Sequence, residues 1–248
     1  MLWYKMWRES GVRFTISAAA LLWMCAMVVL LQRRVRAHAD EPISYAHYIW
    51  SAVYKANVLD LFVLLVIVLG LGGLLQERAQ GTAGFTLSLP VSRWRLTAVR
   101  AAMGCLQVAI LALLPALLIP LLSPVVGETY SFAPAFQFSV LWADAGMVIF
   151  AMALFFSVVL PGAYSAAIAS VAALLAYSIL ADLPPLARYP ALDLIETMHG
   201  AQLLASRREV SLAALLAPLP WLALGLYALV ALCLVGAAGA IMAGKDFP

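Results

Sequence analysis

Six long apolar segments constrain the fold of this chain more than any other feature of its sequence. A helix that crosses the roughly 30 Å hydrocarbon layer of a membrane needs about 20 predominantly apolar residues. Segments of this kind cover residues 14–31, 57–75, 96–122, 138–160, 163–181 and 212–243. They are continuously apolar, whereas the strands of a membrane β-barrel alternate in polarity over about ten residues. The sequence therefore predicts an all-α, polytopic membrane protein with six transmembrane helices.

The composition and the short connecting segments favour a single membrane domain. Of the 248 residues, 65% are hydrophobic and 11% are charged, compared with about 45–50% apolar and about 25% charged residues in a soluble domain. This excludes a soluble globular protein, a disordered chain and a protein that binds nucleic acid. No connecting segment reaches the roughly 50 residues of a small folded domain. We expect one transmembrane domain over residues 1–248, with any soluble domain supplied by a partner chain.

The sequence lacks motifs for catalysis, cofactor binding or metal binding. None of its three histidines falls within a predicted span, so we expect no histidine-ligated haem in the membrane. Gly239, Gly244 and Lys245 match part of a P-loop, but Asp246 follows instead of Ser or Thr, and no strand precedes them. We therefore expect that the chain is not an enzyme, does not hydrolyse ATP itself and binds no cofactor or metal.

Six spans place both termini on the same side of the membrane, and the positions of Lys and Arg bear on which side that is. Of the 15 Lys and Arg residues, eight lie on the terminal side and seven on the other. The basic run Arg33-Arg34-Val35-Arg36 directly after the first span argues against cytoplasmic termini, whereas the acidic residues, most of which lie opposite, favour them. We expect both termini in the cytoplasm and the chain in the cell inner (cytoplasmic) membrane.

Two shorter segments have patterns typical of helices that lie along a membrane surface. Trp3, Met6 and Trp7 share one face at helical spacing, with charged residues on the opposite face. This pattern predicts an N-terminal amphipathic helix before the first span. Residues 191–205 carry apolar side chains at similar spacing and predict an external helix between spans five and six.

Asp144 is the best candidate for a functional charge within the membrane. It lies in the fourth apolar segment beside Trp142, a residue type that favours the membrane interface. A charge in a span is costly, so it marks a polar pathway unless it lies at an interfacial end. Both interpretations remain open, and we expect a position near the outer mouth. Asp60 and Arg100 lie near span ends, where their side chains can extend to the interface.

The most informative polar segment covers residues 76–95, after the second apolar segment. Phe85 and Leu89 are four residues apart, so one helical turn would align them. Pro90 limits that helix, and Ser92 is placed to cap the helix that continues into the third span. The pattern predicts a short helix across the cytoplasmic face and a sharp turn back into the membrane. It fits either an ordinary connection or an element that docks a soluble partner.

This loop contains the motifs Glu77-Arg78, Gly81-Thr82 and Leu89-Pro90-Val91-Ser92-Arg93 directly after an apolar span. Together they resemble the first cytoplasmic loop in the permease subunits of ABC-2-type transporters. The resemblance extends along the whole chain, although only the loop motif is moderately specific. It implies six spans with cytoplasmic termini, an elbow helix at Trp3, Met6 and Trp7, and a coupling helix between spans two and three.

The resemblance also implies the function of a permease subunit. Such a chain moves a substrate across the membrane, most simply as an exporter, with ATP and Mg held by a separate soluble ATPase subunit. A second permease chain completes the complex as a homodimer or heterodimer in the lipid bilayer. The residues implied in coupling to the ATPase are Glu77, Arg78, Gly81, Thr82, Phe85, Leu89, Pro90 and Arg93.

Two other functions remain as alternatives. A non-transport membrane anchor or assembly subunit would need no coupling helix. An intramembrane enzyme would need a cluster of polar catalytic groups within the spans, where the sequence offers few. The sequence does not identify a substrate, but spans with so few charges favour an amphipathic or lipid-like cargo.

Overall fold

The computed structural model describes residues 2–37, 44–72, 92–160, 162–186, 189, 192–200 and 219–244. Within these ranges every regular element is a helix. Six helical segments in this part of the chain are long and apolar enough to cross a membrane: Leu2–Ala37, Tyr45–Gly70, Arg93–Val126, Phe132–Val159, Tyr164–Ala181 and Trp221–Gly244. The predicted all-α fold with six candidate membrane-spanning helices is therefore confirmed.

The first span is one continuous helix, α1 (Leu2–Ala37), of 36 residues. At 1.5 Å per residue it is about 54 Å long and extends well beyond the hydrocarbon layer. The elbow helix expected at Trp3, Met6 and Trp7 is not confirmed as a separate element, because these residues form the first turns of α1. Met6 is buried while Trp3 and Trp7 are exposed, so the three do not share one environment. No proline interrupts the following turns, which lets the helix continue.

The second span begins earlier than expected and is not a regular helix. It consists of α2 (Tyr45–Ile49), the π-helix η1 (Trp50–Lys55) and α3 (Asn57–Gly70). Ser44 caps α2 by accepting a hydrogen bond from the backbone N–H of a residue three positions on. Ala56 has φ −136° and ψ −143°, which interrupts the helix between η1 and α3. Because π-helices are rare and often lie near functional sites, η1 is a candidate part of a functional site.

The third span, α6 (Arg93–Leu122), is capped at its start as predicted. The Ser92 hydroxyl accepts a hydrogen bond from the Arg95 backbone N–H at 3.3 Å. Two prolines lie inside α6 without ending it, and the 3₁₀-helix η2 (Ser123–Val126) follows directly. Gly127 then turns the chain with φ +78°, a conformation that glycine adopts without strain.

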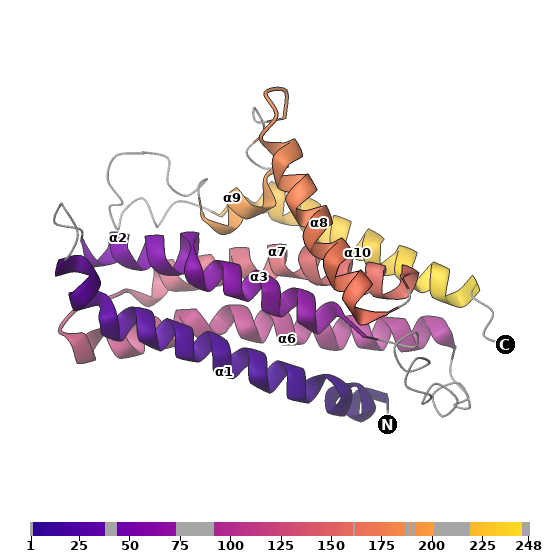
Figure 1. Cartoon of the computed structure of the whole chain (residues 1–248), viewed down its shortest axis with the longest axis horizontal. Coiled ribbons are helices and arrows are strands. Elements are labelled where there is room, and N and C mark those ends of the chain that lie inside the picture. Colours follow the sequence, from indigo (N-terminus) through magenta and orange to yellow (C-terminus); the bar gives the residue numbers. More distant parts are fainter. Residues whose placement is uncertain are drawn as a thin grey trace.

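The fourth span, α7 (Phe132–Val159), is the central helix and packs against α3, α6, α8, α9 and α10 (Figure 1). Glycines permit its closest contacts. A Cβ at Gly104 of α6 would lie 1.9 Å from the Phe150 ring, and one at Gly70 of α3 would lie 2.5 Å from Ala153 Cβ. Both glycines thus serve packing within the chain, with α3 and α6 each approaching α7 near Phe150.

The last two spans, α8 (Ala163–Ala181) and α10 (Trp221–Gly244), are the most exposed. The axis of α8 diverges from the other helices (Figure 1), whereas α10 packs along α7 and α6. Helix α10 starts at Trp221, since Leu219 and Pro220 are not helical, and the predicted start of the sixth span at residue 212 lies outside the described residues. The short helix α9 (Leu194–Met198) lies between these spans, within the segment predicted to be helical.

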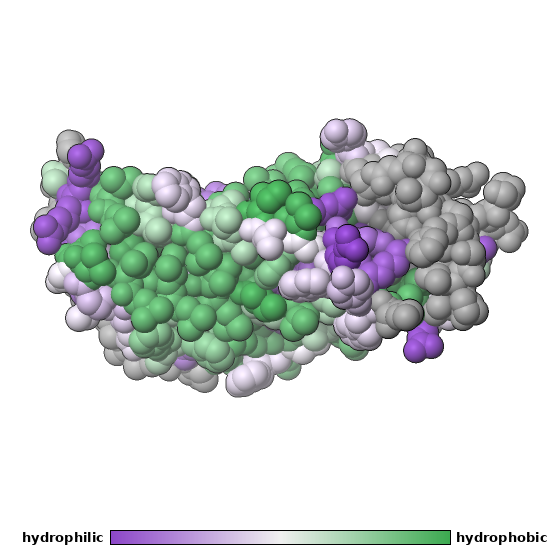
Figure 2. Space-filling view, turned by 90° about the horizontal axis from the view of Figure 1, so that it is seen from below, coloured by the Kyte–Doolittle hydropathy of each residue, from purple (hydrophilic) through white to green (hydrophobic). Residues whose placement is uncertain are grey.

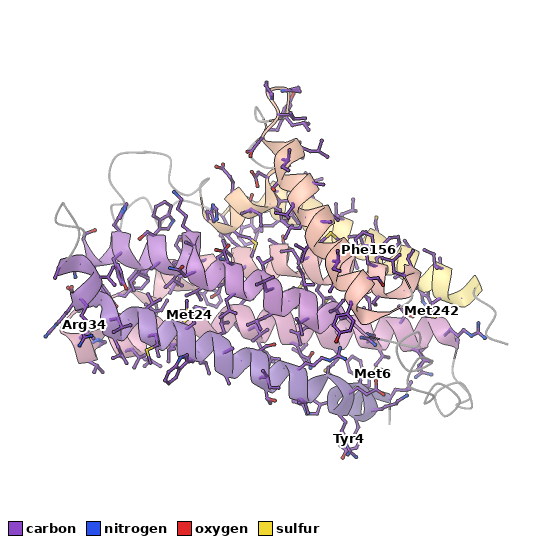
Figure 3. All side chains as sticks on the ribbon, in the orientation of Figure 1. Tyr4, Met6, Met24, Arg34, Phe156 and Met242 are labelled. Carbon is purple, nitrogen blue, oxygen red and sulfur yellow. The ribbon has the colours of Figure 1, made fainter. Side chains whose placement is uncertain are left out.

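Both chain termini lie at one end of the bundle (Figure 1), as six spans require. We call this the terminal end. A broad hydrophobic surface covers the middle of the molecule, and hydrophilic side chains gather towards its two ends (Figure 2). Met6 and Met242 lie at the terminal end and Arg34 at the opposite end (Figure 3). This distribution of polarity matches that of a protein that crosses a membrane.

Candidate functional site

Two arginines meet at the carboxyl end of α3, where the second span ends. Arg13 Nη1 of α1 donates a hydrogen bond to the Leu71 carbonyl oxygen at 2.5 Å, and Arg100 Nη2 of α6 donates to the same oxygen at 2.8 Å. The last carbonyls of a helix lack intrahelical partners and carry partial negative charge. The charge-assisted hydrogen bonds therefore fix the end of α3 to both α1 and α6.

A second polar contact joins α1 and α6 next to these arginines. Gln107 Nε2 donates a hydrogen bond to Ser10 Oγ at 2.7 Å, and the Gln107 side chain is buried. We call the whole group the terminal clamp: Ser10, Arg13, Leu71, Arg100 and Gln107. Two residues of the terminal clamp stand out in the sequence, because Arg100 and Gln107 are polar residues in an apolar segment. However, Arg100 was expected to extend to the interface, whereas it binds a backbone carbonyl.

A small hydrophobic core holds four helices together at the same end. It joins α1, α6, α7 and α10 through Met6, Leu96, Met103, Val158, Ala238 and Met242. The Trp94 ring lies directly on Gly239, where a Cβ would come within 2.1 Å of it. The first turn of α6 is therefore in direct contact with the last turns of α10.

The predicted coupling segment runs between two points of this terminal end. Seven of its eight predicted residues lie outside the described residues: Glu77, Arg78, Gly81, Thr82, Phe85, Leu89 and Pro90. The eighth, Arg93, is the first residue of α6 and follows the capping Ser92. Leu71 of the terminal clamp lies just before this segment in the chain, and Ser92, which caps α6, lies just after it. Its role in coupling stays a prediction.

A second polar region surrounds α9. Trp142 Nε1 donates a hydrogen bond to the Met198 carbonyl oxygen at 3.1 Å, and Trp50 Nε1 donates to that of His199 at 2.9 Å. Gly200 follows with φ +70°, and a Cβ there would lie 2.5 Å from the Phe138 ring. Two indoles and a close backbone contact thus hold the end of α9 against η1 and α7.

Trp142 lies inside the protein rather than on its surface, so it gives no support to a position at the membrane interface. Its side chain is fully buried in the protein core. Its ring lies between those of Tyr54 and Phe62, with centroid distances of 5.6 and 4.9 Å. The sequence could not distinguish an interfacial tryptophan from one whose N–H finds a partner inside the bundle.

Asp144 is the thirteenth of the 28 residues of α7, and its side chain is half-buried. One carboxylate oxygen, Oδ2, is buried and accepts no hydrogen bond. Asp144 is close enough to Tyr227 of α10 to affect it electrostatically. Tyr227 lies six residues after Trp221, about 9 Å along α10 from its start. Asp144 thus lies near the middle of α7, so its expected position near the outer mouth stays a prediction, and its polar neighbours suit a functional role.

The charged groups that the structure describes around α9 are mainly acidic. Asp193 Oδ1 caps α9 by accepting a hydrogen bond from the Glu196 backbone N–H at 3.0 Å. Burial and the nearby Lys55 lower the pKa of His199, while Asp193 and Asp60 act in the opposite direction. In the part of the chain that the structure describes, no three His, Cys, Asp or Glu residues come together as a metal site. The charged side chains that the structure describes near the end of α9 are thus Asp60, Asp193 and Glu196, together with Lys55.

The basic run after the first span is bound by the protein itself. Arg33 Nη2 donates a hydrogen bond to the Val126 carbonyl oxygen at 3.1 Å. Arg36 forms an ion pair with Glu128, with an Nη1–Oε1 distance of 2.6 Å. The charge of this run is thus partly used within the chain, at the end opposite the termini.

Comparisons with known proteins give no further guidance on these two regions. No family model, no curated protein and no solved structure matches this chain. Functional interpretation therefore depends on the geometry described above and on the motifs of the sequence.

Proposed function

We propose that this chain is the membrane subunit of an ATP-driven transporter of the ABC-2 type. In this proposal residues 73–91 dock on a separate soluble ATPase subunit that binds ATP and Mg. The terminal clamp is the observation that carries the proposal. It ties the point where the segment leaves α3 to α1 and α6 through Arg13 and Arg100. A force on the segment would therefore reach several spans at once.

The mechanism follows from two-state coupling between the subunits. ATP binding closes a pair of ATPase chains, and each docked segment moves with its ATPase. The movement reaches α3 through Leu71, and it reaches α6 directly at Ser92. It continues to α10 because Trp94 packs on Gly239. A second permease chain, identical or similar, provides the other wall of the substrate path.

Cytoplasmic termini are part of the proposal. The basic run after the first span argues against this orientation, but two of its arginines form contacts within the protein, with Val126 and Glu128. The terminal clamp and the docking segment would then face the cytoplasm, where ATP is available.

Cysteine labelling tests this orientation. Ser92→Cys should react with a membrane-impermeant maleimide only after cells are opened, and Asp182→Cys should react in intact cells. The two positions are separated by three spans and must lie on opposite sides. The unsubstituted chain, whose three cysteines lie within the spans, is the control. The reverse labelling pattern would invert the topology.

The docking role is tested by binding of the ATPase. Glu77→Ala and Phe85→Asp should each weaken binding of the proposed ATPase subunit by about thirtyfold, as expected for a central interface residue. The physical reasons are the loss of a charged contact and the placing of a charge in an apolar groove. Binding would be measured by titration of purified subunits.

Ser88→Ala is the matched control, since it changes a small polar residue of the same segment. It should leave ATPase binding within a factor of two of the unsubstituted chain. If both variants bind the ATPase normally, the segment is an ordinary connection. If no ATPase binds the unsubstituted chain, the function of a non-transport membrane anchor replaces this proposal.

A further inference from the structure

The first turns of α1 carry an exposed face with aromatic and basic side chains. Trp7 and Arg8 lie three and four positions after Tyr4, so the three residues share one side of the helix. Tyr4 is 68% exposed and Trp7 is 40% exposed, and Arg8 is exposed as well. The Tyr4 side chain points away from the bundle (Figure 3), whereas Met6 is buried in it. We call Tyr4, Trp7 and Arg8 the α1 face.

Arg8 supplies the net positive charge of these turns. Lys5 forms an ion pair with Glu9, with an Nζ–Oε1 distance of 3.4 Å, so these two charges offset each other. The Trp7 ring contacts that of Phe14 with a centroid distance of 5.8 Å, which holds the indole against the helix. The α1 face therefore combines one cation with two aromatic side chains that carry hydrogen-bond donors.

The length of α1 places this face at the depth of phospholipid headgroups. Arg8 and Arg33 lie 25 positions apart in one continuous helix, which corresponds to about 37 Å. This distance exceeds the roughly 30 Å of the hydrocarbon layer but not the roughly 40–45 Å of the whole bilayer. The surface between the two ends is largely hydrophobic (Figure 2). Tyr and Trp also favour the headgroup layer, so the whole face suits this depth.

The two ends of the molecule differ in charge when every charged residue of the sequence outside the spans is counted. By the order of the spans, the opposite end carries seven Lys and Arg residues and seven Asp and Glu residues. The terminal end carries eight basic residues and three acidic ones, a net charge of +5. These are Lys5, Arg8, Arg13, Arg78, Arg93, Arg95, Arg100 and Lys245, with Glu9, Glu77 and Asp246. A positive surface at headgroup depth attracts anionic lipids.

From this arrangement we infer that the α1 face binds the phosphate group of an anionic phospholipid. The Arg8 guanidinium can bind a phosphate through two parallel hydrogen bonds. The Tyr4 hydroxyl, one turn away on the same side, and the Trp7 indole N–H provide further donors. A zwitterionic lipid would bring its own ammonium group to a terminal end that is already positive, so an anionic headgroup fits better. This interaction needs no ATPase subunit.

The inference is tested by native mass spectrometry of the full chain in detergent micelles, with phosphatidylglycerol as the probe. The unsubstituted chain should bind phosphatidylglycerol at least about fivefold more tightly than phosphatidylcholine. Arg8→Gln should weaken binding of the tightest phosphatidylglycerol by about fivefold, the usual contribution of one basic residue near an anionic surface. Arg8→Lys keeps the charge and should bind within a factor of two of the unsubstituted chain. Tyr4→Phe should weaken binding by about threefold, because one donor is lost.

Arg34→Gln is the matched control, since it removes an exposed arginine at the other end of α1. It should bind phosphatidylglycerol within a factor of two of the unsubstituted chain. Equal binding of the two lipids by the unsubstituted chain, or unchanged binding in Arg8→Gln, would overturn the inference. Displacement of the lipid by an equal concentration of glycerol phosphate would also overturn it, because the face would then bind soluble phosphate. Since no ATPase is present, these outcomes are distinct from a failure of the docking proposal.

Discussion

Gly104→Ala is expected to destabilise the helix bundle by about 1–3 kcal/mol, the usual cost of overpacking a close contact. A Cβ at this position would lie 1.9, 2.3 and 2.8 Å from three atoms of the Phe150 ring. The ring is fully buried in α7 and has little room to move. Gly70 of α3 also packs closely on the Phe150 backbone. A Cβ at Gly70 would lie 2.9 Å from the Phe150 carbonyl oxygen. Helices α6 and α7 must therefore separate.

The measurement is the free energy of unfolding of the purified chain in mixed micelles, titrated with a denaturing detergent. Gly236→Ala in α10 is the matched control, since a Cβ there has no atom within 4 Å. It should leave stability unchanged or raise it slightly, because alanine has the higher helix propensity. Equal stability of the Gly104 and Gly236 variants would contradict the packing described for α6 and α7.

Arg13→Ala and Arg100→Ala are each expected to remove about 1.5–3 kcal/mol of stability and to impair coupling. Each deletes a charge-assisted hydrogen bond to the Leu71 carbonyl oxygen. Because both arginines share this acceptor, the double variant should depart from the sum of the single effects. In the complete transporter we expect ATP hydrolysis to continue while transport is lost, since the end of α3 is no longer tied to α1 and α6.

The measurements are a double-mutant cycle of unfolding free energies and the amount transported per ATP hydrolysed in proteoliposomes. Arg34→Ala is the control, because Arg34 is an exposed arginine of the same helix α1. Strictly additive stability effects would show that the two arginines act separately. Normal transport per ATP in the double variant would remove the terminal clamp from the coupling mechanism.

The parts of the fold that depend on local sequence were predicted well. Hydropathy averaged over about 20 residues identified the number of spans, because the cost of placing polar groups in hydrocarbon adds along a helix. The cap at Ser92 was also predicted, since it depends on one side chain and a backbone N–H three residues away. The motifs of residues 76–95 raised the transporter hypothesis, which the structure leaves as a proposal.

The second span was predicted less well for a physical reason. Residues 45–55 include tyrosines, a histidine, a serine and a lysine, which lower the local hydropathy. Tyr45, Tyr48 and Tyr54 are nevertheless buried, because neighbouring helices cover their rings. The π-helix and the break at Ala56 likewise follow from how this segment packs. Hydropathy does not record such contacts.

By itself the sequence determined the membrane class, the six spans and the local start of α6, since each depends on residues close together in the chain. Only the tertiary structure decided which polar groups meet inside the bundle. Arg13 and Leu71 are 58 positions apart, and Trp142 and Met198 are 56 apart. It also decided that the Oδ2 atom of Asp144 is buried without a hydrogen-bond partner in the described part of the chain. Such pairings depend on how helices pack, and hydrogen bonds across these separations leave no periodic pattern in the sequence.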